Sequence, residues 1–86
     1  MADIQVLLIT ADGCHFCAHA KGVLARVAER YPLTISEIAW DSDEGRRLVE
    51  RDGIPFPPGI YLDRRLFGYG RLSSGKLARW MRVRQL

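Results

Sequence analysis

The chain has 86 residues, 48% of them hydrophobic, and a net charge of +3 at pH 7, and this length predicts one domain over residues 1–86 that buries about 60% of its unfolded surface. No apolar run approaches the ~18 residues of a membrane helix, and Met1-Ala2-Asp3 lacks the basic start of a secretory signal. We therefore expect a cytoplasmic protein without a membrane partner.

The first predicted elements are a buried strand and a helix. Residues 4–9 form an almost continuous apolar run, which is typical of a buried strand. Apolar side chains then recur at helical spacing until Tyr31-Pro32, where the proline ends the helix. The residues of this expected buried helix face are Phe16, Ala20, Val23, Leu24, Val27 and Ala28.

The two cysteines of the chain, Cys14 and Cys17, lie where the strand turns into the helix. Side chains three residues apart on a helix are neighbours, within the Cα separation of about 4.4 to 6.8 Å that a disulfide requires. A purely structural disulfide is disfavoured in a reducing cytosol. The spacing therefore favours a cycling redox pair or a pair of metal ligands.

The middle of the chain predicts a second strand and a short helix. Residues 33–40 alternate imperfectly between apolar and polar, as a strand does. The stretch 41–44 offers a helix cap and negative charge in the first turn, and Gly53 is a natural terminator. Leu48 and Val49 give this helix its buried side.

A hairpin follows in the sequence pattern. Three prolines make residues 54–59 irregular, and residues 60–62 form a third strand. A turn over residues 63–65 brings residues 66–69 back antiparallel. With one last helix the order is βαβαββα, which predicts an α/β fold: a four-stranded mixed sheet flanked by helices, with a right-handed parallel crossover in its first half.

The last predicted helix is basic. Ser73 caps it, and Leu77, Trp80 and Met81 form its buried side. Residues 64–86 contain seven basic residues and no acidic ones, which leaves the rest of the chain at −4. Such a face would suit an acidic protein or a nucleic acid, but a solvated helix surface is the simpler interpretation, and no nucleic-acid motif supports that partner.

Two segments carry a family resemblance. Residues 14–21, CHFCAHAK, are similar to the glutaredoxin pattern C-P-Y-C-x-x-A-K, and residues 53–58, GIPFPP, are similar to the pattern G-I-x-x-[IV]-P. The chain thus resembles the glutaredoxin-like proteins of the thioredoxin superfamily over nearly its whole length. The resemblance implies a thioredoxin/glutaredoxin-like fold, thiol–disulfide oxidoreductase activity, and a cis bond at Pro58 that faces the dithiol, with Pro55 as the competing position.

The expected catalytic residues are Cys14 and Cys17. Cys14 is the nucleophile, and Cys17 is the resolving cysteine that attacks the mixed disulfide. The attacking form is a thiolate, and the N-terminus of a helix commonly lowers the pKa of a cysteine to about 3.5 to 7.5. His15 replaces the proline usual in this family, and we expect its partly charged imidazole to tune the thiolate and to make the pair more oxidising.

The candidate substrate-binding residues are Phe16, Pro57, Pro58, Tyr69 and Arg71. Phe16 is expected to pack rather than to recognise substrate, Tyr69 suits packing and contact equally, and Arg71 would bind a substrate carboxylate. The expected partners are a disulfide-containing protein, or glutathione as a co-substrate, and a reductant or reductase that recycles the pair. We expect a monomer that needs no cofactor beyond the dithiol.

The chain departs from the glutathione-binding members of the family. Asp12-Gly13 stands where those proteins carry a lysine, and residues 68–71, GYGR, stand where they carry Gly-Gly-x-Asp. Pro57 also lacks the N–H that the residue before the cis proline normally gives to a substrate. These departures favour one alternative, a binding module of the same fold with little turnover, docked through its basic C-terminal segment.

A metal or iron–sulfur site is the other alternative. Cys14, His15, Cys17 and His19 offer ligand groups within six residues, but such close spacing would strain one tetrahedral zinc site, and no second ligand pair follows downstream. A cluster shared between two chains, as some glutaredoxin-like proteins hold with glutathione, stays open. We therefore assign no metal ligand in this chain.

Overall fold

The order of helices and strands is the one that the sequence predicts. The computed structural model describes residues 3–84. Its elements are β1 (Ile4–Thr10), α1 (His15–Ala28), β2 (Leu33–Ala39), α2 (Asp43–Asp52), β3 (Gly59–Leu62), β4 (Arg65–Tyr69) and α3 (Ser74–Arg84). The predicted βαβαββα order is therefore confirmed.

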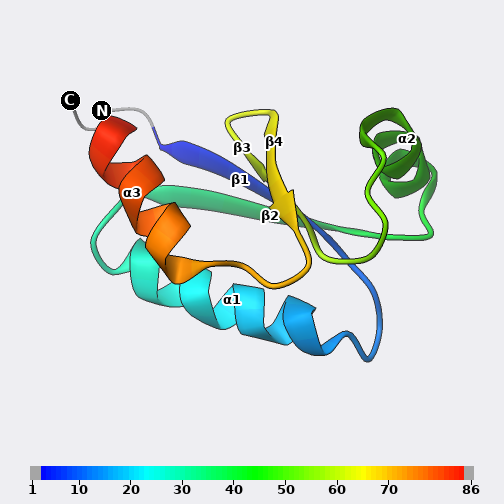
Figure 1. Ribbon diagram of the computed structural model, residues 1–86, viewed down its shortest axis with the longest axis horizontal. Coiled ribbons are helices and arrows are strands. Elements are labelled where there is room, and N and C mark those ends of the chain that lie inside the picture. The colour runs from blue at the N-terminus through cyan, green and yellow to red at the C-terminus, as the bar shows by residue number, and fades with distance from the viewer. Residues whose placement is uncertain (1–2, 85–86) are drawn as a thin grey trace.

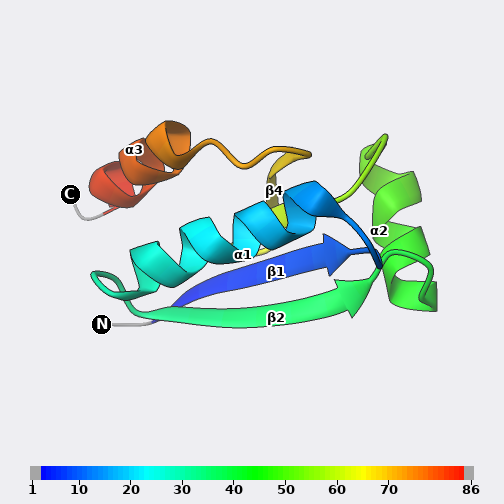
Figure 2. The same cartoon turned by 90° about the horizontal axis from the view of Figure 1, so that it is seen from below.

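The four strands form one mixed sheet in the order β2-β1-β3-β4. β1 and β2 are parallel, whereas β3 is antiparallel to both β1 and β4. Figures 1 and 2 show α1 covering one side of β1 and β2, with α3 on that same side, while α2 lies at the far end of the strands. The parallel crossover and the antiparallel hairpin are both confirmed.

Two hydrophobic clusters lie on opposite faces of the sheet, because alternate residues of β1 point to opposite sides. Ile4, Val6 and Leu8 face the first cluster, and Ile9 faces the second. The other buried residues of the first cluster are Ala20, Val23, Leu24, Ile60, Leu62, Leu72, Leu77 and Met81. The smaller second cluster holds α2 against the sheet through the partly buried Leu48 and Val49.

The predicted helix caps are present. The Ser42 hydroxyl accepts a hydrogen bond from the N–H of Gly45, and Gly53 ends α2 in the left-handed conformation with φ of 66°. Ser73 accepts from the N–H of Lys76 and so caps α3. These local signals place the start and end of α2 and the start of α3, whereas α1 ends at Ala28, three residues before the predicted end at Tyr31-Pro32.

The hairpin turn differs in detail from the prediction. Asp63 and Arg64 alone form its centre, with φ of 48° and 72°, and Arg65 is already paired with Leu62 in β4. In a two-residue hairpin of type I′ both central residues have positive φ, which matches the twist of the flanking strands. The predicted three-residue turn is therefore one residue too long.

The connection between α2 and β3 contains the predicted cis bond. The Pro57–Pro58 peptide is cis, which confirms Pro58 over Pro55. The carbonyl of Pro58 accepts a hydrogen bond of 2.9 Å from the N–H of Gly70, so the end of β4 holds this connection in place. No helix among residues 3–84 is long and apolar enough to cross a membrane.

Candidate functional site

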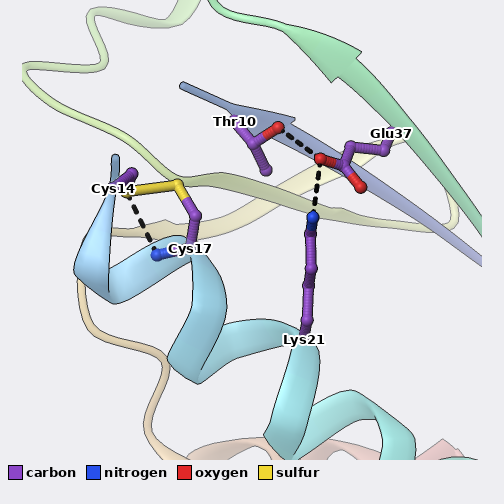
Figure 3. Close-up of a disulfide and its surroundings, with 5 residues drawn as sticks. All are labelled: Thr10, Cys14, Cys17, Lys21 and Glu37. Carbon is purple, nitrogen blue, oxygen red and sulfur yellow. Dashed lines mark hydrogen bonds and ion pairs between the residues drawn. A yellow bond between two sulfur atoms is a disulfide. The ribbon is translucent and has the colours of Figure 1, made fainter. Parts of the chain in front are cut away.

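The two cysteines lie at the N-terminal end of α1. Cys14 is the N-cap residue, with extended backbone angles, and Cys17 lies in the first helical turn. They are joined as a disulfide with a Cα–Cα separation of 5.2 Å (Figure 3). Cys17 is buried, at 3% exposure, whereas Cys14 is half-buried. The predicted position of the pair at the strand-to-helix junction is confirmed.

The sulfur of Cys14 occupies the place of a helix-capping oxygen. The backbone N–H of Cys17 points at the Cys14 Sγ, with a nitrogen–sulfur distance of 3.1 Å (Figure 3). The first turn of α1 contains no acidic residue that would compete for this N–H. After reduction, the same N–H and the positive end of the helix dipole would favour negative charge on Cys14.

A hollow of about 530 Å³ opens beside the dithiol. It is bounded by the end of β1, the following loop, the first turns of α1 and one side chain of β2. Both cysteines, Lys21 and Glu37 line it. A hollow with a sulfur pair in its wall gives a substrate disulfide or thiol room to reach Cys14.

Three polar side chains form a network in the wall of this hollow (Figure 3). The hydroxyl of Thr10 donates to Glu37 Oε2 at 2.6 Å, and Lys21 Nζ lies 2.9 Å from the same oxygen. The Thr10 hydroxyl first, and Lys21 second, hold the pKa of Glu37 below its ordinary value. The carboxylate thus stays ionised and keeps Lys21 directed at the wall instead of at the sulfurs.

The sequence pattern did not reveal this network. Lys21 belongs to the segment that carries the family resemblance, but its partner Glu37 lies on β2, far away in the sequence. β1 and β2 are parallel with Leu8 opposite Glu37 and Thr10 opposite Ala39, so Glu37 and Thr10 share the α1 face of the sheet. Only the strand register places them together. The alternation in residues 33–40 is the one signal from which the face of Glu37 could have been inferred.

The residues between the two cysteines point to solvent. His15 and Phe16 are both exposed, and their rings are 6.2 Å apart and tilted. Phe16 is 40% exposed, so the expectation that it packs in the core is wrong. It lies at the first turn of α1, ahead of the helix face that meets the sheet, and is left available for contact. Ala28, also expected on the buried face, is exposed at the other end of α1.

The cis-proline connection lies near the start of α1. In Figures 1 and 2 the connection between α2 and β3 runs close to the N-terminal end of α1. Pro58 is fully buried and Pro57 is half-buried. Phe56 and Tyr69 make an edge-to-face contact at 5.5 Å and are each about half exposed. Tyr69 therefore packs against Phe56 on one side and leaves about half of its surface exposed for contact.

Two residues after β4 differ in their surroundings. A Cβ at Gly70 would lie 2.6 Å from the Phe56 ring, and its φ is 72°, so this position requires glycine. Arg71 is exposed and forms no ion pair within residues 3–84. Its guanidinium is accessible to a carboxylate, and no feature of the structure assigns one.

Comparison with known proteins identifies the architecture. No protein-family model matches the sequence, and no curated protein does. Among solved structures, thioredoxin-2 of the malaria parasite, described as a component of its protein secretion machinery, matches with a TM-score of 0.67 and 16% identity over 94% of this chain and 82% of its own. A thioredoxin from Thermus thermophilus matches with a TM-score of 0.63 and 16% identity over 98% and 75%. The chain has the thioredoxin fold.

A third solved structure with this thioredoxin fold is protein SA0789 of Staphylococcus aureus, whose function is unknown. Its TM-score is 0.68 at 16% identity, over 99% of this chain and 94% of its own. At such identities the likeness shows the fold alone. In this thioredoxin-fold chain the redox assignment therefore depends on the Cys14–Cys17 disulfide at the start of α1, while the resemblance to glutaredoxins in particular stays a prediction.

Proposed function

We propose that the protein is a thiol–disulfide oxidoreductase that acts on disulfides of proteins or on glutathione-linked thiols, with Cys14 as nucleophile and Cys17 as resolving cysteine. One observation carries the proposal: the half-buried Cys14 sulfur accepts the N–H of Cys17 at the helix N-terminus and borders an open hollow. An attacking thiolate needs both this stabilisation and this access.

The proposed reaction consists of two thiol–disulfide exchanges. The Cys14 thiolate attacks one sulfur of the substrate disulfide, a Cys14–substrate disulfide forms, and the other substrate sulfur leaves as a thiolate that takes up a proton. The Cys17 thiol then loses its proton and attacks the Cys14 sulfur, which releases the second substrate thiol. The products are a reduced substrate and the Cys14–Cys17 disulfide, and an external dithiol or glutathione must return two electrons to the pair.

The cis-proline connection and its neighbours offer the proposed contacts for the substrate chain. Pro57 and Pro58 line the connection beside α1, and the exposed rings of Phe16 and Tyr69 offer apolar contact on either side. Arg71 is the cation available for a substrate carboxylate. A reducing compartment such as the cytosol is the setting in which this reductive direction operates.

The test is a disulfide-reduction assay with a protein disulfide as substrate and a dithiol as electron source. We expect turnover by the parent and a loss of about a hundredfold or more in Cys14→Ser, because the remaining Cys17 is buried and has little access to a substrate disulfide. Cys17→Ser should lose turnover but still form a stoichiometric mixed disulfide, visible by mass spectrometry. Activity that survives Cys14→Ser would eliminate the proposed nucleophile.

A second function, a binding module with little turnover, is favoured by one feature. The residue before the cis bond is Pro57, which has no N–H to donate to a docked chain. If the parent shows no turnover while the trapped Cys17→Ser adduct never forms, the binding module replaces the oxidoreductase.

A further inference from the structure

α1 and α3 lie on the same side of the sheet (Figure 2), and residues of both helices line a groove between them. Its volume is about 300 Å³. The floor is apolar: its lining includes the buried Val23 and Met81 and the half-buried Val27 and Ala78. The remaining lining residues are Arg26, Arg30, Tyr31, Ser74 and Arg82.

The rim of the groove is cationic. Arg26 and Arg30 on the α1 side and Arg82 on the α3 side are all exposed. The ion pairs found within residues 3–84 involve Lys21, Arg51 and Arg84 instead, and no acidic residue lines the groove. Three guanidinium groups thus surround an apolar floor without a carboxylate partner in the described part of the chain.

We infer that this α1–α3 groove docks an acidic amphipathic segment of a partner protein. Apolar side chains of the segment would contact the half-buried Val27 and Ala78, and its carboxylates would pair with the arginines. Guanidinium groups bind carboxylates with two parallel hydrogen bonds, and an amphipathic segment in a groove is a recurring mode of recognition. The lining of the groove contains both the apolar side chains and the guanidinium groups that such a segment would bind.

A nucleic acid fits the groove less well. A phosphate backbone would satisfy the arginines, but its sugars and phosphates offer no apolar group to the half-buried Val27 and Ala78, and single-stranded bases bind on exposed aromatic faces. The one aromatic residue in the lining, Tyr31, is half-buried. The apolar lining therefore favours an amphipathic peptide over a nucleic acid.

The groove is a second site, distinct from the dithiol. Arg26 lies nine residues after Cys17 on the same helix, which corresponds to about 13 Å along the axis. Neither cysteine lines the groove. Docking should consequently be independent of the oxidation state of the dithiol. A protein without oxidoreductase activity could therefore still bind the segment.

The experiment uses the full chain and three fluorescent peptides of about 14 residues, or four helical turns. The first peptide carries glutamate and leucine on opposite helix faces, the second replaces glutamate by glutamine, and the third replaces leucine by serine. Binding is measured by fluorescence anisotropy in about 50 mM salt. We expect saturable binding of the first peptide and affinities about tenfold or more lower for the other two.

Two variants separate the groove from general charge attraction. Arg26→Glu/Arg82→Glu reverses the rim and should lower affinity about tenfold or more, whereas Arg46→Glu/Arg47→Glu makes the same charge change on α2 and should alter it less than about threefold. Ala78→Trp fills the groove without changing charge and should also lower affinity about tenfold. Circular dichroism checks that each variant is folded.

The outcomes are decisive in both directions. Amide shifts of the labelled protein confined to residues 23–31 and 74–82, together with an unchanged affinity in Cys14→Ser/Cys17→Ser, support the docking site. Equal losses in the rim and α2 variants would overturn it, as would full affinity in Ala78→Trp. Preference for a single-stranded oligonucleotide over the acidic peptide would overturn it in favour of nucleic acid.

Discussion

The two ends of α1 carry opposite chemistry. At the N-terminal end a sulfur takes the capping position, the first turn has no acidic residue, and the nearby Lys21 is engaged with Glu37. At the C-terminal end the last turn contains Arg26, Arg30 follows in the next turn, and neither has an ion-pair partner within residues 3–84. One helix therefore carries the proposed thiolate at its start and, at its other end, arginines of the proposed docking groove.

The difference shows how the helix dipole is used. Backbone N–H groups at the start of a helix favour negative charge, and carbonyl groups at its end favour positive charge. Cys14 and Arg26 each stand at the end that suits them. The N-terminal end depends first on backbone N–H groups, to which the expected effect of His15 adds, whereas the C-terminal end depends on side chains, which a single substitution can reverse.

The largest expected effect lies between the two ends, at Leu24. This side chain is fully buried in the first cluster, so Leu24→Ala should lower the free energy of unfolding by about 3 kcal/mol. That is a large part of the stability of a small domain. Urea unfolding followed by circular dichroism measures it. Val83→Ala, at a side chain that is 62% exposed, should change it by less than about 0.5 kcal/mol, and equal losses would contradict the assigned core.

The fold was predictable because its signals are local. The apolar run of β1, the cap at Ser42, the glycine stop at Gly53 and the proline segment each act within a few residues. They place elements regardless of what packs against them. The turn at Asp63 was predicted one residue too long, since the twist of the paired strands, and not the turn residues, sets its length.

The site was predictable only where it is contiguous in sequence. The relation of Cys14 to Cys17 follows from their spacing, and the difference in their burial follows from helix geometry. The link from Lys21 to Glu37 and Thr10 could not be predicted, because it depends on the register of two strands. The exposure of Phe16 was missed because helical spacing alone does not tell where the helix begins to meet the sheet.

Replacing His15 tests the electrostatics of the N-terminal end. His15 follows Cys14 directly in the sequence, and its side chain should favour the thiolate over the disulfide. His15→Pro, which a first helical position tolerates, should make the reduction potential about 20 mV more negative, equivalent to about 1 kcal/mol. Equilibration with glutathione redox buffers measures this.

His15→Ala is the matched control for backbone effects of proline. It should shift the potential in the same direction as His15→Pro, because both remove the imidazole. A proline variant with an unchanged or less negative potential would rule out the tuning role of His15.

The same substitution at both ends sharpens the comparison. Ala18 and Ala25 are exposed on α1, and only Ala18 borders the hollow beside the dithiol. In Ala18→Glu the new carboxylate should lower the thiolate fraction of reduced Cys14 and slow its alkylation by iodoacetamide about twofold, an effect of about 0.4 kcal/mol. Ala25→Glu should leave the alkylation rate unchanged, and an equal slowing in both variants would show that the N-terminal end has no special field.

The smallest expected effect concerns the wall of the hollow. The Thr10 hydroxyl is the main cause of the lowered pKa of Glu37, with Lys21 second. A carboxyl whose pKa is lower in the folded state stabilises the fold above its ordinary pKa of 4.5, and this contribution is lost as the pH falls through the folded value. Because the Glu37 side chain is 42% exposed, solvent screening limits it to about 0.3 kcal/mol.

Thr10→Val removes that hydroxyl and should raise the pKa of Glu37 toward its ordinary value. The free energy of unfolding of the variant, measured in urea relative to the parent, should then be about 0.3 kcal/mol lower at neutral pH than at an acidic pH below the folded-state pKa of Glu37. Comparing the two pH values removes any constant gain from the extra buried methyl group. Ser36→Ala, which deletes an exposed hydroxyl on the other face of β2, should show no such pH dependence. A pH-independent difference in Thr10→Val would mean that Lys21 alone holds the carboxylate in the wall, and that the buried hydroxyl at the end of β1 serves only to pack.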